Sequence, residues 1–445
     1  MKIVIAGAGE VGSHVAKLLS HEEQDIVVID SNPERVAMLD ANYNLMTVLG
    51  SPISFQTLMD AGVERCDLFI AVTPFETSNV TACAMAKSMG AKKTVARIDN
   101  YEFMLQCHRE FFNNLGVDSL IYPELLAAKE IITALERPWV RNWFEIHDGE
   151  LIVVGVKIRD NARILGMQLK EVSMKEHVFH LSAIKRHHET IIPRGDDYIR
   201  SGDILYFTTT PEHIDRLRDA CGKQDTEIRR VMVVGGSRIA VRMAALAKDD
   251  KYRIKIIDFD RGRCMKLPEK CPECTIVHGD GRDIETLKEE NVADYDAFVA
   301  LTGSSETNIL TCLTAKEHGV KKTIAEVENI QFISEAENLN IGTIINKKLL
   351  ASSAVFQLLL DEDESSSAFM ALADAEVADI VAKEGSKITR AAVKDLRLPH
   401  DMTIAGLVRD GKGMLVGGNT LIKPGDHVVV FCLSGAIHKT ERLFN

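Results

Sequence analysis

A glycine-rich pattern near the N-terminus is of the kind that binds phosphate groups. Residues 7–12 read G-A-G-E-V-G, which fits G-x-G-x-x-G, and they follow an apolar run over residues 3–6. In such a loop the first glycine makes a tight turn, the second lets a pyrophosphate approach, and the third lets helix and strand pack closely. The helix that follows would point its free N–H groups at the phosphates. The pattern predicts a nucleotide-binding loop.

Three further side chains would complete such a site. Asp30 follows the apolar run 26–29, about 20 residues beyond the loop, where a carboxylate can accept hydrogen bonds from ribose hydroxyls and repel a 2′-phosphate. This favours NAD or an adenine nucleotide over NADP. Thr73 and Arg97 follow later apolar runs, so both would lie at the carboxyl edge of a parallel sheet, and Arg97 could face a phosphate. A surface ion pair for Arg97, or a fold that has lost its ligand, is the alternative.

The chain contains a second, altered copy of this pattern. Gly7 and Asp30 correspond to Gly235 and Asp258, 228 positions later. The segments 69–73 and 298–302 also match, as do 96–100 and 325–329. Matches in a constant order indicate an internal duplication. In the second copy Ser237 replaces the close-approach glycine, Ala240 replaces the third glycine, and Glu326 replaces Arg97. We therefore expect Asp258 to hold a ligand with less phosphate, or to hold it more loosely.

The cysteines and the absence of catalytic motifs limit the other functions. Cys264, Cys271, Cys274 and His278 include one C-x2-C pair, but they lie within the repeat rather than in a zinc ribbon, so we predict no metal site. The sequence has no Tyr-x-x-x-Lys pair, no G-x-S-x-G and no H-E-x-x-H. These absences predict that the chain is not an enzyme. The alternative is an NAD-dependent oxidoreductase with an unrecognised substrate site.

The elements that must position these residues belong to an α/β fold. Apolar strands alternate with helical patterns in two regions, which predicts two tandem Rossmann-like domains with parallel sheets, each followed by a small α+β lobe. The expected domains are a Rossmann-type lobe over 1–140, a C-lobe over 141–222, a second Rossmann-type lobe over 228–360 and a second C-lobe over 366–445. Apolar helices near 123–135 and 349–360 join the lobes. Such a helix could pack on its own domain or be exchanged between paired domains.

Composition places the chain in an aqueous compartment. The 445 residues carry a net charge of −12 and no apolar run of the roughly 20 residues that span a bilayer. An acidic chain without a basic stripe argues against nucleic acid as a partner, and membrane association would depend on a protein partner. The nine cysteines suit a reducing cytosol. We expect a cytoplasmic protein.

These residues together resemble a known family. The order of the G-x-G-E-V-G loop, Asp30, residues 71–73 with Asn79, Arg97 and a later S-G-D-I-L segment at 201–205 is similar to the RCK (KTN) regulatory domains of potassium channels and transporters. Two such units in one chain resemble the peripheral regulatory subunit of Trk-type potassium uptake systems. The resemblance covers essentially the whole chain, and the duplicated lobe order is its specific part.

The resemblance implies a function and a mechanism. The chain would form a homo-oligomeric ring, a tetramer, on a Trk-type potassium-transporting membrane subunit at the inner face of the cell membrane. NAD(H), ATP or ADP would be regulatory ligands. Nucleotide would change the angle between paired lobes, and segments near 123–140 and 346–360 would pass that change to the pore. The residues carried over to the two sites are Gly7, Gly9, Glu10, Val11, Gly12, Asp30, Thr73 and Arg97, and then Gly235, Gly236, Asp258, Thr302 and Glu326.

Overall fold

The computed structural model describes residues 1–20, 24–175, 178–187, 189–247, 251–360, 366–372, 375–433 and 437–444. The chain divides into two compact units. The first comprises Met1–Ala127 with Asn346–Glu362, and the second comprises Ala128–Ile345 with Asp363–Asn445. Within the described residues, no helix combines the length and the apolar character needed to cross a bilayer.

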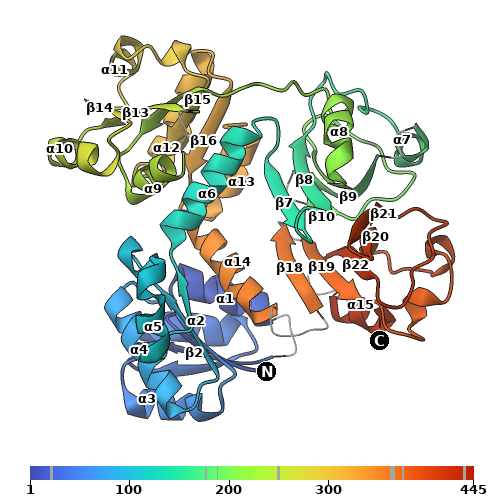
Figure 1. Cartoon of the computed structure of the whole chain (residues 1–445), viewed down its shortest axis with the longest axis horizontal. Helices are drawn as coiled ribbons and strands as arrows, with labels where there is room; N and C mark the ends of the chain where they lie inside the picture. The colour runs from blue at the N-terminus through green and yellow to red at the C-terminus, as the bar shows by residue number, and fades with distance from the viewer. Residues whose placement is uncertain are drawn as a thin grey trace. The chain divides into compact units, whose positions relative to one another are not determined.

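The first unit, whose N-terminal part is coloured blue in Figure 1, contains a six-stranded parallel sheet in the order β3-β2-β1-β4-β5-β6. Strands β1, β2 and β4 are apolar and buried almost throughout, as expected for strands covered on both faces by helices. We call this the first Rossmann lobe. Its elements are β1 (Lys2–Ala6), α1 (Glu10–Ser20), β2 (Asp25–Asp30), α2 (Pro33–Asn42), β3 (Met46–Leu49), α3 (Phe55–Asp60), β4 (Leu68–Ala71), α4 (Glu76–Met89), β5 (Lys93–Arg97), α5 (Arg109–Leu115) and β6 (Ser119–Ile121).

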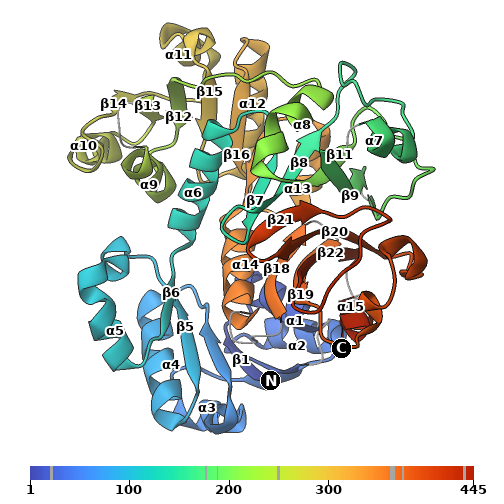
Figure 2. The same cartoon turned by 45° about the vertical axis from the view of Figure 1, so that its right-hand side comes forward.

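The second unit repeats this sheet in the order β14-β13-β12-β15-β16-β17, which confirms the predicted duplication (Figure 2). We call this part the second Rossmann lobe. Its elements are β12 (Arg230–Val234), α9 (Arg238–Leu246), β13 (Arg253–Asp258), α10 (Arg261–Lys270), β14 (Thr275–His278), α11 (Ile284–Glu289), β15 (Ala297–Ala300), α12 (Ser305–Glu317), β16 (Lys322–Glu326), α13 (Gln331–Asn338) and β17 (Thr343–Ile345).

Two antiparallel sheets form the C-lobes, both in the second unit. Their strand orders, β10-β9-β11-β8-β7 and β18-β19-β22-β20-β21, are the same topology traversed from opposite ends. The first C-lobe has β7 (Asn142–Ile146), β8 (Leu151–Lys157), α7 (Leu169–Lys175), β9 (Phe179–Arg186), β10 (Glu189–Ile191), β11 (Ile204–Thr209) and α8 (Ile214–Ala220). The second has β18 (Ser366–Leu372), β19 (Ala375–Val381), β20 (Met402–Arg409), β21 (Lys412–Leu415), β22 (His427–Leu433) and α15 (Ile437–Phe444).

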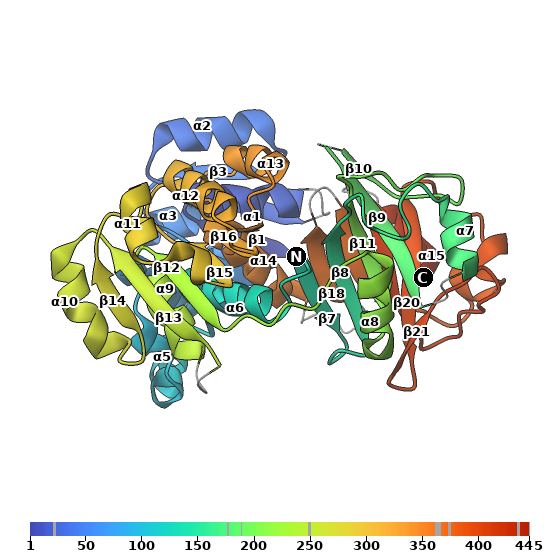
Figure 3. The same cartoon turned by 90° about the horizontal axis from the view of Figure 1, so that it is seen from above.

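One face of each C-lobe sheet packs against the other sheet (Figure 3). The shared core contains Val153 and Tyr206 from the first lobe and Val429 and Phe431 from the second. The opposite face of the first sheet packs with α7 and α8 in a separate core. Because the strands have a period of two, the first sheet presents alternate side chains to these two environments. The two C-lobes therefore form an internal pseudo-dimer.

The joining helices are exchanged between the units. Helix α14 (Lys347–Leu360) follows the second Rossmann lobe in sequence but packs against α1 of the first unit (Figures 1 and 2). Ala351 is buried and Ser352 donates a hydrogen bond to the carbonyl of Val11, so small side chains allow the close approach. Helix α6 (Pro123–Glu136) continues from the first unit into the second. The exchanged arrangement is therefore the one adopted, and the compact units divide the chain after residues 127, 345 and 362.

The segment after α6 is anchored by a buried lysine. The Nζ of Lys322, on β16, donates to the carbonyls of Pro138 and Val140 at 3.2 and 3.3 Å and to the hydroxyl of Thr343 at 2.9 Å. Burial lowers the pKa of Lys322 to about 7. These hydrogen bonds attach the segment that follows α6 to the sheet of the second Rossmann lobe.

Each C-lobe contains the same buried ion pair. Arg186 makes two hydrogen bonds to Asp203, and Arg409 makes two to Asp426, at 2.7–2.9 Å. Both carboxylates are 2% exposed. Burial by itself raises the pKa of Asp426, but the hydrogen bonds from Arg409 and from the Lys423 amide outweigh it, so the net pKa lies below the ordinary 3.8. In each C-lobe the turn that contains this aspartate is thus fixed by a bidentate arginine.

Replacing this arginine should destabilise the second C-lobe. In Arg409→Met the Asp426 carboxylate loses its partner, which should lower the free energy of unfolding by about 2–3 kcal/mol at pH 7, less than for a fully buried pair because the arginine is partly exposed. The wild-type pair stabilises fully above the ordinary carboxyl pKa and loses this contribution as the pH falls below it. The difference between variant and wild type, measured by urea unfolding, should therefore shrink on acidification.

The matched control is Lys170→Met, because Lys170 pairs with Asp196 at an exposed position of the first C-lobe. We expect this substitution to leave the urea midpoint essentially unchanged. Equal effects of the two substitutions would contradict the role given to the buried pair.

Candidate functional site

The glycine loop of the first unit has the geometry of a phosphate-binding turn. Gly7 has φ +113°, and its N–H donates to the carbonyl of Ile29 at the end of β2. A Cβ added at Gly12 would lie 1.8 Å from the carbonyl oxygen of Gly7, so only glycine allows α1 to pack this closely on the turn. A Cβ added at Gly9 would meet no atom within 4 Å. The space beside Gly9 is therefore open to a ligand.

Asp30 lies at the end of β2, next to this loop. One carboxylate oxygen accepts a hydrogen bond from the Ala8 amide at 2.6 Å, and the other accepts one from the Asn32 amide at 2.8 Å. Arg35 approaches the carboxylate only to 3.9 Å, and its side chain is 46% exposed. The backbone thus fixes the orientation of the Asp30 carboxylate, and each of its oxygens retains a lone pair that can accept from a ligand hydroxyl.

A buried asparagine joins the next two strand ends. The Asn79 side chain accepts from the amide and the hydroxyl of Thr73 and donates to the carbonyls of Thr73 and Arg97, at 2.6–3.0 Å. It holds the ends of β4 and β5 together at the carboxyl edge. A Cβ at Gly7 would lie 3.1 Å from the Thr73 amide, so the end of β4 also adjoins the glycine turn. The Thr73 hydroxyl is therefore part of a structural network at the edge of the site.

Arg97 makes the ion pair that was considered as the alternative to a ligand role. Its guanidinium forms an ion pair with Asp99 at 3.1 Å, and the side chain is 21% exposed. Its Nε is buried and has no hydrogen-bond partner among the described residues. A buried donor of this kind is costly to leave unsatisfied. An additional acceptor at this position would complete its hydrogen bonding.

A carboxylate that the sequence interpretation missed stabilises the loop after β5. Glu76, in the first turn of α4, accepts from the amides of Asp99 and Asn100, each at 2.8 Å. In the second Rossmann lobe the Ser305 hydroxyl accepts in the same way from the amides of Glu328 and Asn329. The only signal in the sequence is their matching position at the start of α4 and α12.

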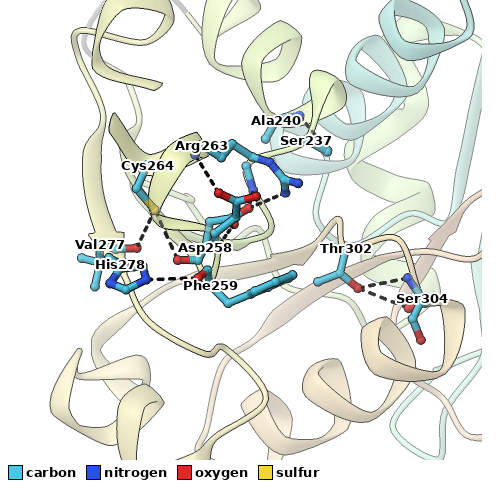
Figure 4. A network of polar contacts seen from close by, with 12 residues as sticks. Ser237, Ala240, Asp258, Phe259, Arg263, Cys264, Val277, His278, Thr302 and Ser304 are labelled. Atoms are coloured by element: carbon cyan, nitrogen blue, oxygen red, sulfur yellow. Dashed lines mark hydrogen bonds and ion pairs between the residues drawn. The ribbon is translucent and has the colours of Figure 1, made fainter. Parts of the chain in front are cut away.

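The second Rossmann lobe has the same framework with more of its polar atoms engaged (Figure 4). Asp258 accepts from the amides of Gly236 and Asp260 at 2.6 and 2.8 Å and from Arg263 at 2.8 Å. Arg263 follows Asp258 by five positions, as Arg35 follows Asp30, but here the ion pair is closed. A ribose hydroxyl would compete with the guanidinium for the Asp258 carboxylate.

Two other changes alter the phosphate side of this second site. Ser237 stands where the first loop has Gly9, and its hydroxyl accepts from the amide of Ala240, which caps α9 (Figure 4). Glu326 is 3% exposed and stands where the first lobe has Arg97. Thr302 and Asn308 repeat the Thr73–Asn79 network, and Gly235 repeats the left-handed turn with φ +99°. The fold of the site is kept, but its charges are rearranged, because Glu326 stands in place of Arg97 and Arg238, the first residue of α9, stands in place of Glu10.

The cysteines beside this site contact the backbone. The Cys264 thiol donates to the carbonyl of Asp258, and the His278 ring lies 3.1 Å from the carbonyl of Phe259 (Figure 4). Among the described residues, Cys264, Cys271, Cys274 and His278 do not gather into a metal-ligating group.

Known domain families match all four lobes. The TrkA-N domain matches residues 3–123 and 231–347, and the TrkA-C domain matches residues 153–222 and 377–445. The chain is 30% identical over 454 residues to the Trk system potassium uptake protein TrkA of Haemophilus influenzae, covering 100% of the chain and 98% of that protein. It is 28% identical over 452 residues to TrkA homolog 2 of Methanosarcina mazei, with full coverage of both.

Solved structures share the fold. The GsuK RCK domain matches with a TM-score of 0.59 at 15% identity, covering 100% of the chain and 94% of that domain. The GsuK channel bound to NAD matches with the same score and identity, covering 100% of the chain and 78% of the channel. The predicted fold class, two tandem Rossmann-like lobes each followed by an α+β C-lobe, is confirmed. The chain, with two TrkA-N domains and two TrkA-C domains, belongs to the TrkA family.

Proposed function

We propose that the chain is a nucleotide-binding regulatory subunit of a Trk-type potassium transporter, and that the first Rossmann lobe is its principal ligand site. The observation that carries the proposal is the open space beside Gly9, bordered by the Asp30 carboxylate and the N-terminal end of α1. This combination suits a ligand with both ribose and phosphate groups. One solved structure of GsuK, which has the same fold, is described as bound to NAD, and a second structure of GsuK is described as bound to ADP.

Different residues of the first lobe would contact different groups of the ligand. Asp30 would accept hydrogen bonds from ribose hydroxyls, and the amides near Gly9 and Glu10 would face the phosphates. The buried Nε of Arg97 would find an acceptor on the ligand. NAD(H), ATP and ADP all offer these groups. Bound nucleotide would place negative charge and bulk at the start of α1. Regulation would need only this binding, without any reaction of the nucleotide.

A route from this loop to the exchanged helix is provided by Glu10. It begins α1, and its carboxylate pairs with Lys348 at the start of α14 at 2.7 Å. Phosphate near the loop would weaken this pair by repelling Glu10 and attracting Lys348. Nucleotide would therefore bias the packing of α14 on α1. A ligand regulates only by its difference in affinity between two such states.

A potassium transporter is the partner that the relatives favour. Full-length relatives from several organisms carry the name of a Trk system potassium uptake protein. A homo-oligomeric ring on the cytoplasmic face of the Trk-type membrane subunit would bring the binding site of each copy to a common pore. The competing oxidoreductase interpretation is disfavoured, because the full-length relatives are named as potassium uptake proteins and the chain is a non-enzymatic member of their family. The second Rossmann lobe would bind nucleotide more weakly, because the Asp258 carboxylate already forms an ion pair with Arg263.

Two glycine substitutions separate binding from folding. Gly9→Ala adds a methyl group to open space, so it should leave the thermal midpoint of unfolding unchanged. The same methyl group should weaken the binding of NADH and ADP, measured by calorimetry, at least about tenfold. Gly12→Ala places a methyl group against the Gly7 carbonyl and should lower the thermal midpoint. Unchanged affinity for every nucleotide in Gly9→Ala would contradict the site, as would failure of the wild type to bind any of them.

The proposed route is tested at Lys348. In Lys348→Met the loop residues are intact, so we expect nucleotide affinity to stay within about threefold of wild type, because a partly exposed ion pair contributes little. The nucleotide-dependent change in potassium uptake by the assembled transporter should fall, and Lys348→Arg should restore it. A full nucleotide response in Lys348→Met would exclude this ion pair as the route while leaving the binding site in place.

A further inference from the structure

The internal pseudo-dimer of C-lobes contains a cluster of two histidines and one aspartate, none of which belongs to a Rossmann lobe. His147 comes from the turn between β7 and β8 of the first C-lobe, Asp379 from β19 and His427 from the start of β22. One potential ligand atom from each residue lies within 4.8 Å of the others. The cluster joins residues that are separated by 232 positions in the chain.

The strand register explains why the two residues of the second C-lobe face this turn. Asp379 lies two residues from Val377 on β19, and His427 lies two residues from Val429 on β22, so each shares a face with its valine. Both valines belong to the core shared by the two sheets. Asp379 and His427 therefore lie on the face that contacts the first C-lobe. The turn places His147 opposite them, and its Nε2 contacts the Asp379 carboxylate.

The polar atoms of the cluster are not satisfied by the protein alone. Asp379 is 2% exposed, and its Oδ1 has no hydrogen-bond partner among the described residues. The Nδ1 of His427 is also buried without a hydrogen bond there, and it lies 3.4 Å from Oδ2 of Asp379. A buried carboxylate with an unused oxygen is stabilised by a further donor or by a cation. A cation held between the carboxylate and the two imidazoles would supply it.

We propose that His147, Asp379 and His427 form a binding site for a divalent first-row transition-metal ion, with zinc as the representative. Imidazole nitrogen and carboxylate oxygen are suitable donors for such ions, at about 2.0–2.2 Å. A tetrahedral ion with these bonds holds its ligand atoms about 3.3 Å apart. The cluster is close enough to reach this spacing by side-chain adjustment. Three protein ligands leave one position for water.

The ion would act as a clip between the two C-lobes, since one ligand comes from the first lobe and two from the second. The equivalent positions in the first C-lobe are Gly155 and Ile204, as the strand pairing shows. Neither residue can bind a metal, so the pseudo-symmetric position cannot form a second site. The ion would therefore fix one side of the pseudo-dimer only, and its stoichiometry would be one per chain.

Zinc titration of the full chain, after removal of metals with a chelator, tests the proposal. Calorimetry should give one zinc per chain for wild type, and zinc should raise the thermal midpoint of unfolding by several degrees. His427→Ala and His147→Ala should each weaken binding about 100-fold and abolish the thermal shift. His147 lies in a turn outside the second sheet. His147→Ala therefore still tests the site if His427→Ala does not fold.

Two controls separate this site from other zinc ligands in the chain. The double variant Cys271→Ser/Cys274→Ser removes the C-x2-C pair, and His400→Ala removes an exposed histidine of the second C-lobe. Both should retain one zinc and the full thermal shift. Loss of zinc in the cysteine variant with retention in His147→Ala and His427→Ala would overturn the proposal. Absence of stoichiometric zinc binding by wild type would overturn it as well.

Discussion

The contact between Gly12 and the Gly7 carbonyl is the constraint on which the first unit depends. With no side chain at Gly12, α1 can begin directly above the turn, and any Cβ would meet the carbonyl oxygen at 1.8 Å. This position of α1 leaves space at Gly9, brings the Ala8 amide to Asp30 and offers a surface for α14. The proposed ligand site and the surface that receives the exchanged helix are thus two consequences of one close approach. In the proposed regulation, α1 is the element that the ligand and the exchanged helix would both contact.

The two halves share a fold but differ in the polar groups that they carry. The second Rossmann lobe keeps the turn, the buried asparagine and the acidic residue, but its carboxylate is paired with Arg263 and its phosphate side carries Glu326. In the C-lobes it is the second copy that carries the additional polar groups. Asp379 and His427 stand where the first C-lobe has Gly155 and Ile204, which cannot bind a metal. Each half therefore retains the fold of the other and carries polar groups that the other lacks.

The sequence was sufficient to predict the parts of this structure that depend on local pattern. The glycine turn, Asp30 at the end of β2, and the positions of Thr73 and Arg97 follow from parallel strands that end at one edge. The exchange of α14 could not be predicted, because an apolar helix face has the same pattern whichever domain it packs on. The cluster of His147, Asp379 and His427 could not be predicted either, because it depends on which faces of two distant sheets meet. The matching spacing of Arg35 and Arg263 was visible in the sequence, but their different distances to the carboxylate were not.

The central claim is that nucleotide at the first glycine loop changes the packing of α14. Hydrogen–deuterium exchange of the full chain, with and without saturating NADH or ADP, measures both regions at once. The account predicts that nucleotide slows amide exchange near residues 8–12 and also changes it, in the same titration, across residues 347–355. Slower exchange in the loop with no change in α14 would contradict the claim that the exchanged helix responds to the ligand.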